Sequence, residues 1–274
     1  MSEITNGVAC MKSLLLSVCL LIAVLGQAQS NREPLFTSFD GTKIHYDILG
    51  EGKPVVLIHG FISTSESWKR SAVRQTLADA GFKVVTLDLR GNGLSDKPHA
   101  AEAYRDNTEL KDVMALMKHL GLKNYDVVGY SRGAILTAKL LTMDKQVRRA
   151  VMGGISVDFS DPNWIRRRNF FEALTKPGSH PELQPAVDNA KKAGADTVVL
   201  ARLQEFQPVT TKAELAKIRI PVLVVNGDQD MDNGDPQTLV DAIPGSRLVI
   251  VPGNHGGAMR TPEFAKAVVE FLTK

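Results

Sequence analysis

The sequence predicts an α/β fold with a mainly parallel, eight-stranded sheet and helices on both of its faces. Short runs rich in Val and Ile recur along the chain, and stretches with the spacing of amphipathic helices separate them. The length of 274 residues suits one large domain of this class. Six predicted strands are buried runs, at 54–59, 82–89, 125–128, 147–155, 221–225 and 247–251.

The other two strands are expected between Phe36 and Leu49, as an antiparallel hairpin at the sheet edge that turns at Asp40-Gly41. One helix is predicted from Asn107 or Thr108 to Gly121, because apolar residues recur there every three or four positions. The last helix opens with Thr261-Pro262-Glu263, a cap followed by proline in the first turn.

The stretch from about 156 to 211 interrupts this alternation. It holds no convincing strand but contains Pro, Trp and Phe residues and helical stretches such as 164–174. We interpret it as a small helical cap inserted into a single domain that spans residues 29–274. No internal repeat or second catalytic domain is expected.

Residues 1–28 have the pattern of a secretory signal peptide. Lys12 precedes an apolar run from Leu14 to Leu25, and Gly26-Gln27-Ala28 follows as a small-residue cleavage site. A run of about twelve residues is too short for a stable membrane span. We therefore expect an exported protein, periplasmic or extracellular, that is cleaved after Ala28. Met11 is a plausible physiological start.

Composition excludes several function classes. The net charge is +3 with Lys and Arg scattered along the chain, which gives a nucleic-acid role little support. The one basic run, 166–168, is interpreted as a solvated helix face in preference to an anion-attracting site. Cys10 and Cys19 both precede the predicted cleavage point, so a cysteine nucleophile or thiolate metal ligand is not expected.

A candidate nucleophile lies in Gly129-Tyr130-Ser131-Arg132-Gly133, which matches G-x-S-x-G. The motif directly follows the strand at 125–128 and directly precedes a helical run from 134 to 143. Small residues two before and two after Ser131 allow a strained strand-to-helix turn that exposes the hydroxyl. The helix amino end then directs partial positive charge at a developing oxyanion. Ser131 is therefore predicted to be catalytic.

Ser131 needs a base and an orienting carboxylate. His255 stands in a Gly-rich loop after a late strand, and imidazole titrates near neutrality. The loop Asn226-Gly227-Asp228-Gln229-Asp230 follows the buried strand at 221–225 and offers the acid. We choose Asp230; the alternatives are Asp228, which can instead brace the turn, Asp232, and Asp158 after the preceding strand.

Backbone amides are expected to form the oxyanion hole. One donor is the N–H of Arg132, directly after the nucleophile, and the other is the N–H of Phe61. His59 is expected to brace this loop without transferring protons. Because the donors are amides, the side chains of Arg132 and Phe61 are expected to tolerate replacement with modest loss.

From about residue 36 to 274 the chain resembles the α/β-hydrolase superfamily. The resemblance rests on the order and spacing of His59-Gly60-Phe61, a D-x-R-G-x-G-x-S turn at 88–95, the G-x-S-x-G motif, the loop 227–230 and His255. It implies an acid at the position of Asp230, a scaffold role for the turn at 88–95, and no cofactor or metal. A serine nucleophile also distinguishes the chain from the epoxide hydrolase and haloalkane dehalogenase branches, which have aspartate there.

The predicted function is hydrolysis of carboxylic esters or related small acyl substrates through an acyl-enzyme. A carbon–carbon bond hydrolase, an aminopeptidase and a perhydrolase remain alternatives, because fold and triad do not determine the leaving group. A ligand-binding or sensory protein with negligible turnover is the alternative outside enzymes. The sequence leaves oligomeric state open.

Overall fold

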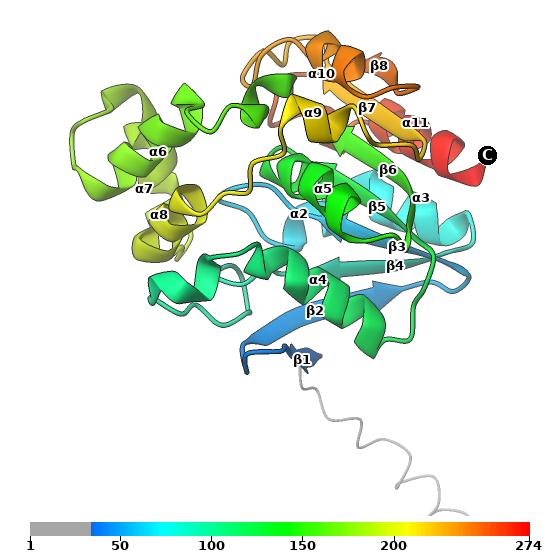
Figure 1. Ribbon diagram of the computed structural model, residues 1–274, viewed down its shortest axis with the longest axis horizontal. Helices are drawn as coiled ribbons and strands as arrows, with labels where there is room; N and C mark the ends of the chain where they lie inside the picture. The colour runs from blue at the N-terminus through cyan, green and yellow to red at the C-terminus, as the bar shows by residue number, and fades with distance from the viewer. Residues whose placement is uncertain (1–33) are drawn as a thin grey trace, which may run out of the picture. The chain divides into compact units, whose positions relative to one another are not determined.

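The computed structural model describes residues 34–274; the predicted signal peptide and both cysteines lie outside the described residues. The described chain forms one sheet in the order β1-β2-β4-β3-β5-β6-β7-β8 (Figure 1). β1 pairs antiparallel with β2, β2 pairs antiparallel with β4, and every other pairing is parallel. The predicted eight-stranded, mainly parallel sheet and its edge hairpin are confirmed. The strands are β1 Leu35–Thr37, β2 Lys43–Leu49, β3 Lys53–Ile58, β4 Phe82–Leu87, β5 Tyr125–Tyr130, β6 Val147–Gly153, β7 Val222–Gly227 and β8 Arg247–Val251.

Helices cover both faces of the sheet. Neighbouring side chains of a strand point to opposite faces, so Val56 packs in one core while Val55 and Leu57 pack in the other. The first core is covered by α4 Thr108–His119, α5 Arg132–Met143 and α10 Gln237–Ala242. The second is covered by α2 Glu66–Lys69, α3 Ala72–Asp79 and α11 Pro262–Thr273.

Between β6 and β7 the chain is helical. Its elements are η2 Val157–Ser160, α6 Ile165–Thr175, η3 Pro181–Leu183, α7 Gln184–Lys192, α8 Thr197–Glu205 and α9 Lys212–Leu215. We call α6 to α8 the helical segment (residues 165–205). A small apolar cluster joins it to the rest of the fold: Val199, Leu200 and Leu203 pack with Tyr104 of η1 (Ala101–Tyr104) and with the partly buried Phe61. Figure 1 shows the three helices together beside the sheet.

The turn at 88–95 is held by buried polar contacts. The Asp88 carboxylate accepts hydrogen bonds from the backbone N–H groups of Ser65 at 2.7 Å and Leu94 at 2.9 Å. Gly93 has φ 50°, and a Cβ there would collide with the Asp88 carboxylate, so only glycine fits. This turn is scaffold, as the sequence indicated.

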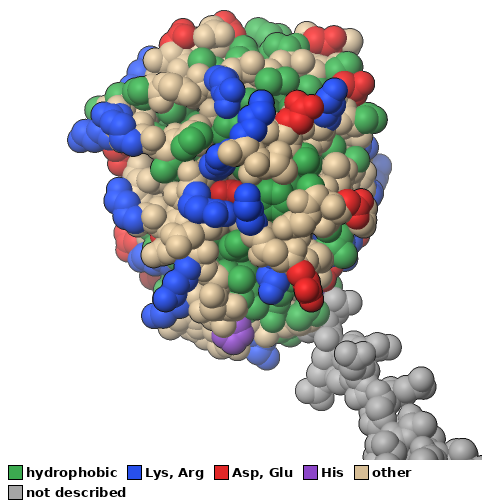
Figure 2. Space-filling view, turned by 90° about the vertical axis from the view of Figure 1, so that its right-hand side faces the viewer, with side chains coloured by type: hydrophobic (Ala, Val, Ile, Leu, Met, Phe, Trp, Pro, Cys, Tyr) green, Lys and Arg blue, Asp and Glu red, His purple; other side chains and the backbone are tan. Residues whose placement is uncertain are grey.

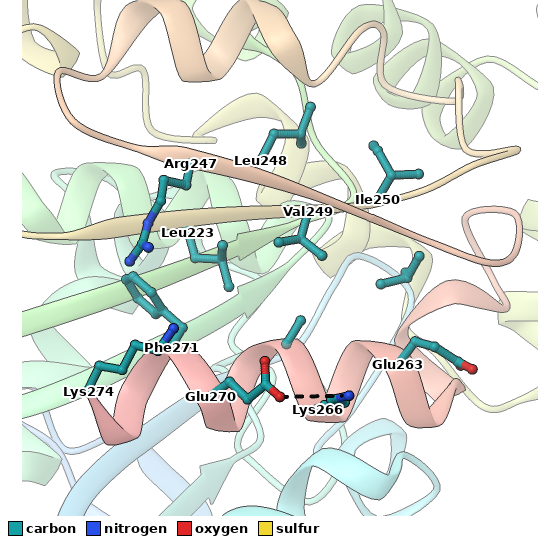
Figure 3. Close-up of a pocket in the computed structure, with 12 residues that line it drawn as sticks. Leu223, Arg247, Leu248, Val249, Ile250, Glu263, Lys266, Glu270, Phe271 and Lys274 are labelled. Atoms are coloured by element: carbon teal, nitrogen blue, oxygen red, sulfur yellow. Dashed lines mark ion pairs between the residues drawn. The ribbon is translucent and has the colours of Figure 1, made fainter.

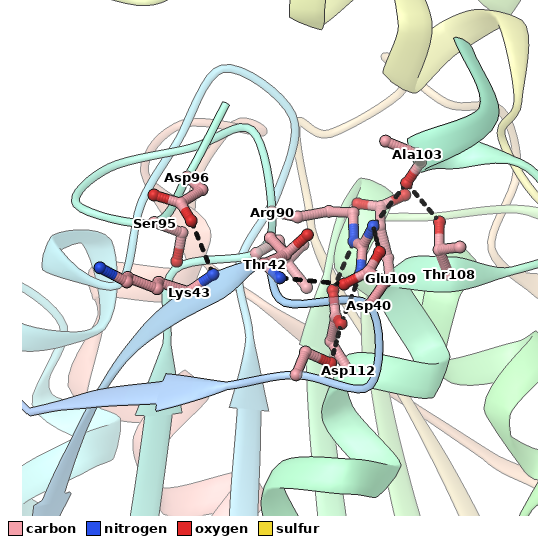
Figure 4. Close-up of polar contacts among 12 residues, drawn as sticks. Asp40, Thr42, Lys43, Arg90, Ser95, Asp96, Ala103, Thr108, Glu109 and Asp112 are labelled. Carbon is pink, nitrogen blue, oxygen red and sulfur yellow. Dashed lines mark hydrogen bonds and ion pairs between the residues drawn. The ribbon is translucent and has the colours of Figure 1, made fainter. Parts of the chain in front are cut away.

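Arg90, in the same turn, joins four parts of the fold (Figure 4). Its fully buried guanidinium donates to both carboxylate oxygens of Asp112 at 2.6 and 2.7 Å, to Asp40 at 2.8 Å and to the Ala103 carbonyl at 2.6 Å. Burial by itself would raise the pKa of Asp40, but hydrogen bonds from Arg90 and Thr42 hold it at about 2. The cluster ties the turn to the edge hairpin, η1 and α4.

The face seen in Figure 2 carries Lys and Arg side chains that are spread among hydrophobic and uncharged surface. This distribution agrees with the small surplus of +3 over the whole sequence. Within residues 34–274, no helix has both the length and the apolarity that crossing a membrane requires.

Candidate active site

Ser131 lies at a sharp turn between β5 and α5. Its backbone has φ 54° and ψ −122°, a conformation that L residues rarely adopt. A Cβ at Gly129 would collide with the Gly133 carbonyl oxygen and the Thr137 hydroxyl, and a Cβ at Gly133 would collide with the Ile58 carbonyl oxygen. Glycine at both positions therefore allows the turn, which holds the Ser131 hydroxyl at the carboxyl end of the sheet.

His255 lies between Ser131 and Asp230. Its Nε2 is 2.9 Å from the Ser131 Oγ, and its Nδ1 is 2.9 and 3.1 Å from the two carboxylate oxygens of Asp230. Asp230 is buried, whereas the imidazole is 21% exposed. The three side chains come from the loops after β5, β7 and β8, which meet because parallel strands end at one edge of the sheet. Such a chain of contacts suits proton transfer from the serine.

The other aspartates considered from the sequence lie elsewhere. Asp228 is exposed and accepts a hydrogen bond from the Gly253 N–H at 2.8 Å, so it braces the loop before His255. Asp232 is exposed and lies 3.6 Å from Arg166. A Cβ on Gly234 would lie 2.7 Å from an Asp158 carboxylate oxygen, which places Asp158 against that loop.

The Tyr130 side chain supports this arrangement, and the sequence reasoning missed it. Its hydroxyl donates to the His255 carbonyl oxygen at 2.8 Å and lies 3.4 Å from Asp230 Oδ2. Its ring lies against the imidazole, with centroids 5.3 Å apart. Burial, and then the nearby Asp230 charge, raise the pKa of Tyr130, so the phenol stays protonated and keeps donating. The variable position of G-x-S-x-G gave no signal for this role.

The loop after β3 runs beside Ser131. A Cβ built on Gly60 would lie 3.3 Å from the Ser131 Cβ, so the backbone of residues 60–61 approaches the serine closely. Burial lowers the pKa of His59, which keeps the ring neutral; Nε2 accepts from the Leu89 N–H at 3.1 Å and Nδ1 lies 2.9 Å from the Gly60 carbonyl oxygen. His59 thus braces the loop, as the sequence indicated.

A pocket of about 180 Å³ opens above Ser131 and His255. Its walls come from the loop after β3, the start of α5 and the helical segment. They include Phe61, Ile62, Arg132, Ile135, Ile155, Trp164, Arg166, Phe170, Gln204, Gln207 and Asn233. Arg132 is the first residue of α5, where backbone N–H groups have no acceptor within the helix.

One sequence expectation about Arg132 is wrong. Its side chain is buried and donates to both carboxylate oxygens of Glu109, at 2.8 and 2.6 Å, and to the Leu203 carbonyl at 3.1 Å. Replacing Arg132 would leave the buried Glu109 carboxylate without its partner, which commonly costs about 3–5 kcal/mol. We therefore expect replacement of the Arg132 side chain to destabilise the protein, although only its backbone amide is predicted to contact the oxyanion.

The interpretation of 166–168 as a solvated helix face is also wrong for its first member. Arg166 lies on the wall of the active-site pocket and stacks on Phe170, with the guanidinium carbon 5.3 Å from the ring centroid. Arg167 donates to the Pro162 carbonyl at 2.6 Å, and Arg168 is exposed. The sequence alone does not show which arginine of the run 166–168 points into the pocket.

A larger groove of about 330 Å³ lies between β8 and α11 (Figure 3). Apolar side chains such as Leu223 and Val249 face it, and an ion pair between Lys266 and Glu270 at 3.8 Å lies along α11. Ser131, His255 and Asp230 do not line this groove.

Comparison with known proteins assigns the family. A family model described as alpha/beta hydrolase fold matches residues 53–176. A bromoperoxidase from Bacillus anthracis has 25% identity and a TM-score of 0.66, covering 85% of this chain and 96% of that one. The chain belongs to the α/β-hydrolase superfamily. It is accordingly a hydrolase enzyme with the α/β-hydrolase fold.

Two further proteins resemble this α/β-hydrolase. A Synechocystis protein named as a non-heme chloroperoxidase is 29% identical over 248 residues, which cover 77% of this chain and 87% of that protein. An esterase from Exiguobacterium antarcticum has a TM-score of 0.73 at 21% identity and covers 89% of this chain and all of that one. At that identity the esterase supports the fold alone.

Proposed function

We propose that this α/β-hydrolase hydrolyses carboxylic esters of small molecules, with Ser131 as nucleophile, His255 as general base and Asp230 as orienting acid. The observation that carries the proposal is the position of the imidazole, 2.9 Å from the serine oxygen on one side and 2.9 Å from the buried carboxylate on the other. These distances suit general-base catalysis in the free enzyme.

Acylation is the first step of the proposed mechanism. His255 accepts the Ser131 proton while Oγ attacks the ester carbonyl, and the buried Asp230 carboxylate stabilises the imidazolium. The backbone N–H groups of Phe61 and Arg132 donate to the oxyanion, and His255 then protonates the departing alkoxide. The alcohol leaves, and Ser131 carries the acyl group.

Deacylation repeats the sequence with water. His255 takes a proton from water, whose oxygen attacks the acyl-enzyme carbonyl, and the proton is returned to Oγ as the carboxylic acid forms. The pocket of about 180 Å³ favours a short acyl chain over a long one.

Peracid formation is a second candidate, supported by the relatives named as haloperoxidases. In this reaction hydrogen peroxide takes the place of water at the acyl-enzyme, so that a peracid leaves and Ser131 is regenerated. The same three residues would serve both reactions. Peracid production from acetate and hydrogen peroxide, measured beside ester hydrolysis, compares the two activities directly.

The first test uses p-nitrophenyl esters from acetate to decanoate with the purified protein. We expect multiple turnovers, and a fall in kcat of at least about 10³-fold in Ser131→Ala and His255→Ala. Asp230→Asn should cost about 10²- to 10⁴-fold. Asp228→Asn is the matched control in the same loop and should cost less than about tenfold, because Asp228 only braces the loop.

Each other outcome has a defined meaning. Absence of turnover together with absence of labelling by a fluorophosphonate would refute the esterase proposal. Labelling of Ser131 without turnover would retain the serine nucleophile and direct the search to other acyl bonds. A larger loss in Asp228→Asn than in Asp230→Asn would overturn the choice of the acid.

A further inference from the structure

Within residues 34–274, basic but no acidic side chains line the active-site pocket. Among the described residues that line it there are two arginines, Arg132 and Arg166, and no aspartate or glutamate. The Arg132 guanidinium is already engaged, since both of its terminal nitrogens bind the Glu109 carboxylate. Arg166 is therefore the arginine of the wall whose charge remains available to a ligand.

An aromatic contact positions Arg166, and its guanidinium makes no hydrogen bond to another described residue. Its guanidinium stacks on Phe170, whose ring lies edge-on to Phe61 with centroids 5.4 Å apart. Stacking on an aromatic face holds the planar cation while its N–H edge stays free to donate. The Arg166 side chain is 32% exposed, so a ligand entering the pocket can reach it.

The nearest carboxylate to Arg166 is a weak and exchangeable partner. Asp232 Oδ2 lies 3.6 Å from the guanidinium, beyond hydrogen-bond distance, and the Asp232 side chain is 54% exposed. Exposed pairs of this kind contribute about 0–1 kcal/mol. Asp232 nevertheless places a carboxylate beside the Arg166 guanidinium.

Two buried amides add polar capacity to the same wall. Gln204 is 4% exposed and Gln207 is 6% exposed, and both line the pocket. Their N–H groups can donate to a carboxylate that Arg166 holds by charge.

We propose that Arg166 makes this pocket selective for short esters that carry a free carboxylate a few carbon atoms from the scissile carbonyl, such as half-esters of dicarboxylic acids. The carboxylate displaces Asp232 from Arg166 while the ester carbonyl lies at Ser131. The inference rests on the proposed esterase function and specifies its substrate class.

The test compares two probes of equal chain length, mono-p-nitrophenyl adipate and p-nitrophenyl hexanoate. Ser131→Ala supplies the background, because the free carboxylate of the adipate ester can also attack its own carbonyl. In Arg166→Gln the ratio of kcat/KM for the anionic over the neutral probe should fall about 10- to 100-fold, the loss of a charge-assisted hydrogen bond. Arg168→Gln, an equal charge change at an exposed site of α6, should leave the ratio unaltered.

Asp232→Asn tests whether the substrate carboxylate competes with Asp232 for Arg166. Removing the competing carboxylate should raise the ratio by about two- to fivefold, and added salt should lower the ratio in the wild type. An equal ratio in the wild type and Arg166→Gln would overturn the inference, as would a lower ratio in Asp232→Asn.

A readout without turnover separates this inference from the proposed function. Isothermal calorimetry with adipate should detect binding to the wild type and at least about tenfold weaker binding to Arg166→Gln. If no ester is hydrolysed but adipate binds through Arg166, the esterase proposal fails and the anion site stands. If esters are hydrolysed but adipate binding does not depend on Arg166, the anion site fails alone.

Discussion

Behind the imidazole of His255, a tyrosine hydroxyl and a buried carboxylate lie close together. Tyr130 donates to the His255 carbonyl oxygen at 2.8 Å and lies 3.4 Å from Asp230 Oδ2. Gly154 preserves the space around these rings, because a Cβ there would lie 2.8 Å from Tyr130 and 3.0 Å from His255. The position of the imidazole thus depends on side chains that do not touch Ser131.

Tyr130→Phe should lower kcat on short esters by about fivefold and leave KM nearly unaltered. The variant removes one hydrogen bond of about 1 kcal/mol that positions His255. The pH profile of kcat/KM should also shift, because the Asp230 carboxylate loses a nearby hydroxyl. Steady-state kinetics between pH 5 and 9 test both effects; an unaltered profile with unaltered kcat would contradict the positioning role.

Asp126 on β5 predicts a pH dependence of stability. Burial raises its pKa from 3.8 to about 6, against the opposing charge of Arg148, and Oδ1 has no hydrogen-bond partner. Because the folded pKa is the higher one, the native state binds the extra proton, and the free energy of unfolding falls as pH rises from about 4 to about 6.

Asp126→Asn should therefore be more stable than the wild type at pH 8, by on the order of 1–2 kcal/mol, since one pKa unit corresponds to about 1.4 kcal/mol. The advantage should shrink towards pH 4, where the wild-type carboxyl is protonated. Urea denaturation at the two pH values measures it. An equal difference at both would contradict the assigned cause.

At the scale of elements, the side chain of Arg132 connects three helices. Arg132 begins α5, Glu109 lies in the first turn of α4, and the Leu203 carbonyl that Arg132 also binds belongs to α8. Gly91 adds a close approach, because a Cβ there would collide with Val199 of α8. The helical segment is thus bound to Arg132, the residue that directly follows Ser131.

Glu109→Gln should destabilise the protein by about 3 kcal/mol, because it leaves the buried Arg132 guanidinium without a compensating charge. Limited proteolysis should cleave the helical segment faster than in the wild type, since the bond to Leu203 is weakened. Glu214→Gln removes a more exposed pair with Lys139 and is the control, with an expected cost below about 1 kcal/mol. Equal costs in the two variants would contradict the bridging role.

At the scale of the whole molecule, the parallel sheet brings the residues of the candidate site together. β5, β7 and β8 end at the same edge, so residues 131, 230 and 255 meet although more than a hundred positions separate the first from the last. The helical segment and the loop after β3 close the pocket from the side. The arrangement of these three side chains therefore depends on the strand order of the sheet.

The predicted signal peptide leads to a prediction about export and cleavage of the full-length chain. Expression in a bacterium with Sec export should yield a protein whose first residue is Gln29, because Gly26-Gln27-Ala28 has the small residues that signal peptidase requires. Amino-terminal sequencing and intact mass measure the cleavage. Ala28→Tyr is the control and should retain the leader. Recovery of the uncleaved wild type from the cytoplasm would contradict export.

The sequence alone determined the fold class, the eight strands and the candidate nucleophile, because these follow from local patterns. Buried Val and Ile runs mark strands, and two glycines that permit a strained turn mark Ser131. Tertiary structure decided which aspartate meets His255. Asp228 and Asp230 both follow the same strand, but in the fold Asp228 accepts from the Gly253 N–H whereas Asp230 lies against His255.

The inward turn of Arg166, the hydroxyl of Tyr130 and the burial of Arg132 were likewise decided by packing. Tyr130 depends on residue 255 and Arg132 on residue 109, and Arg166 lines a pocket to which Phe61 and His255 also contribute. A periodicity places a residue on a face of its own element, but the element packed against that face determines what the side chain contacts.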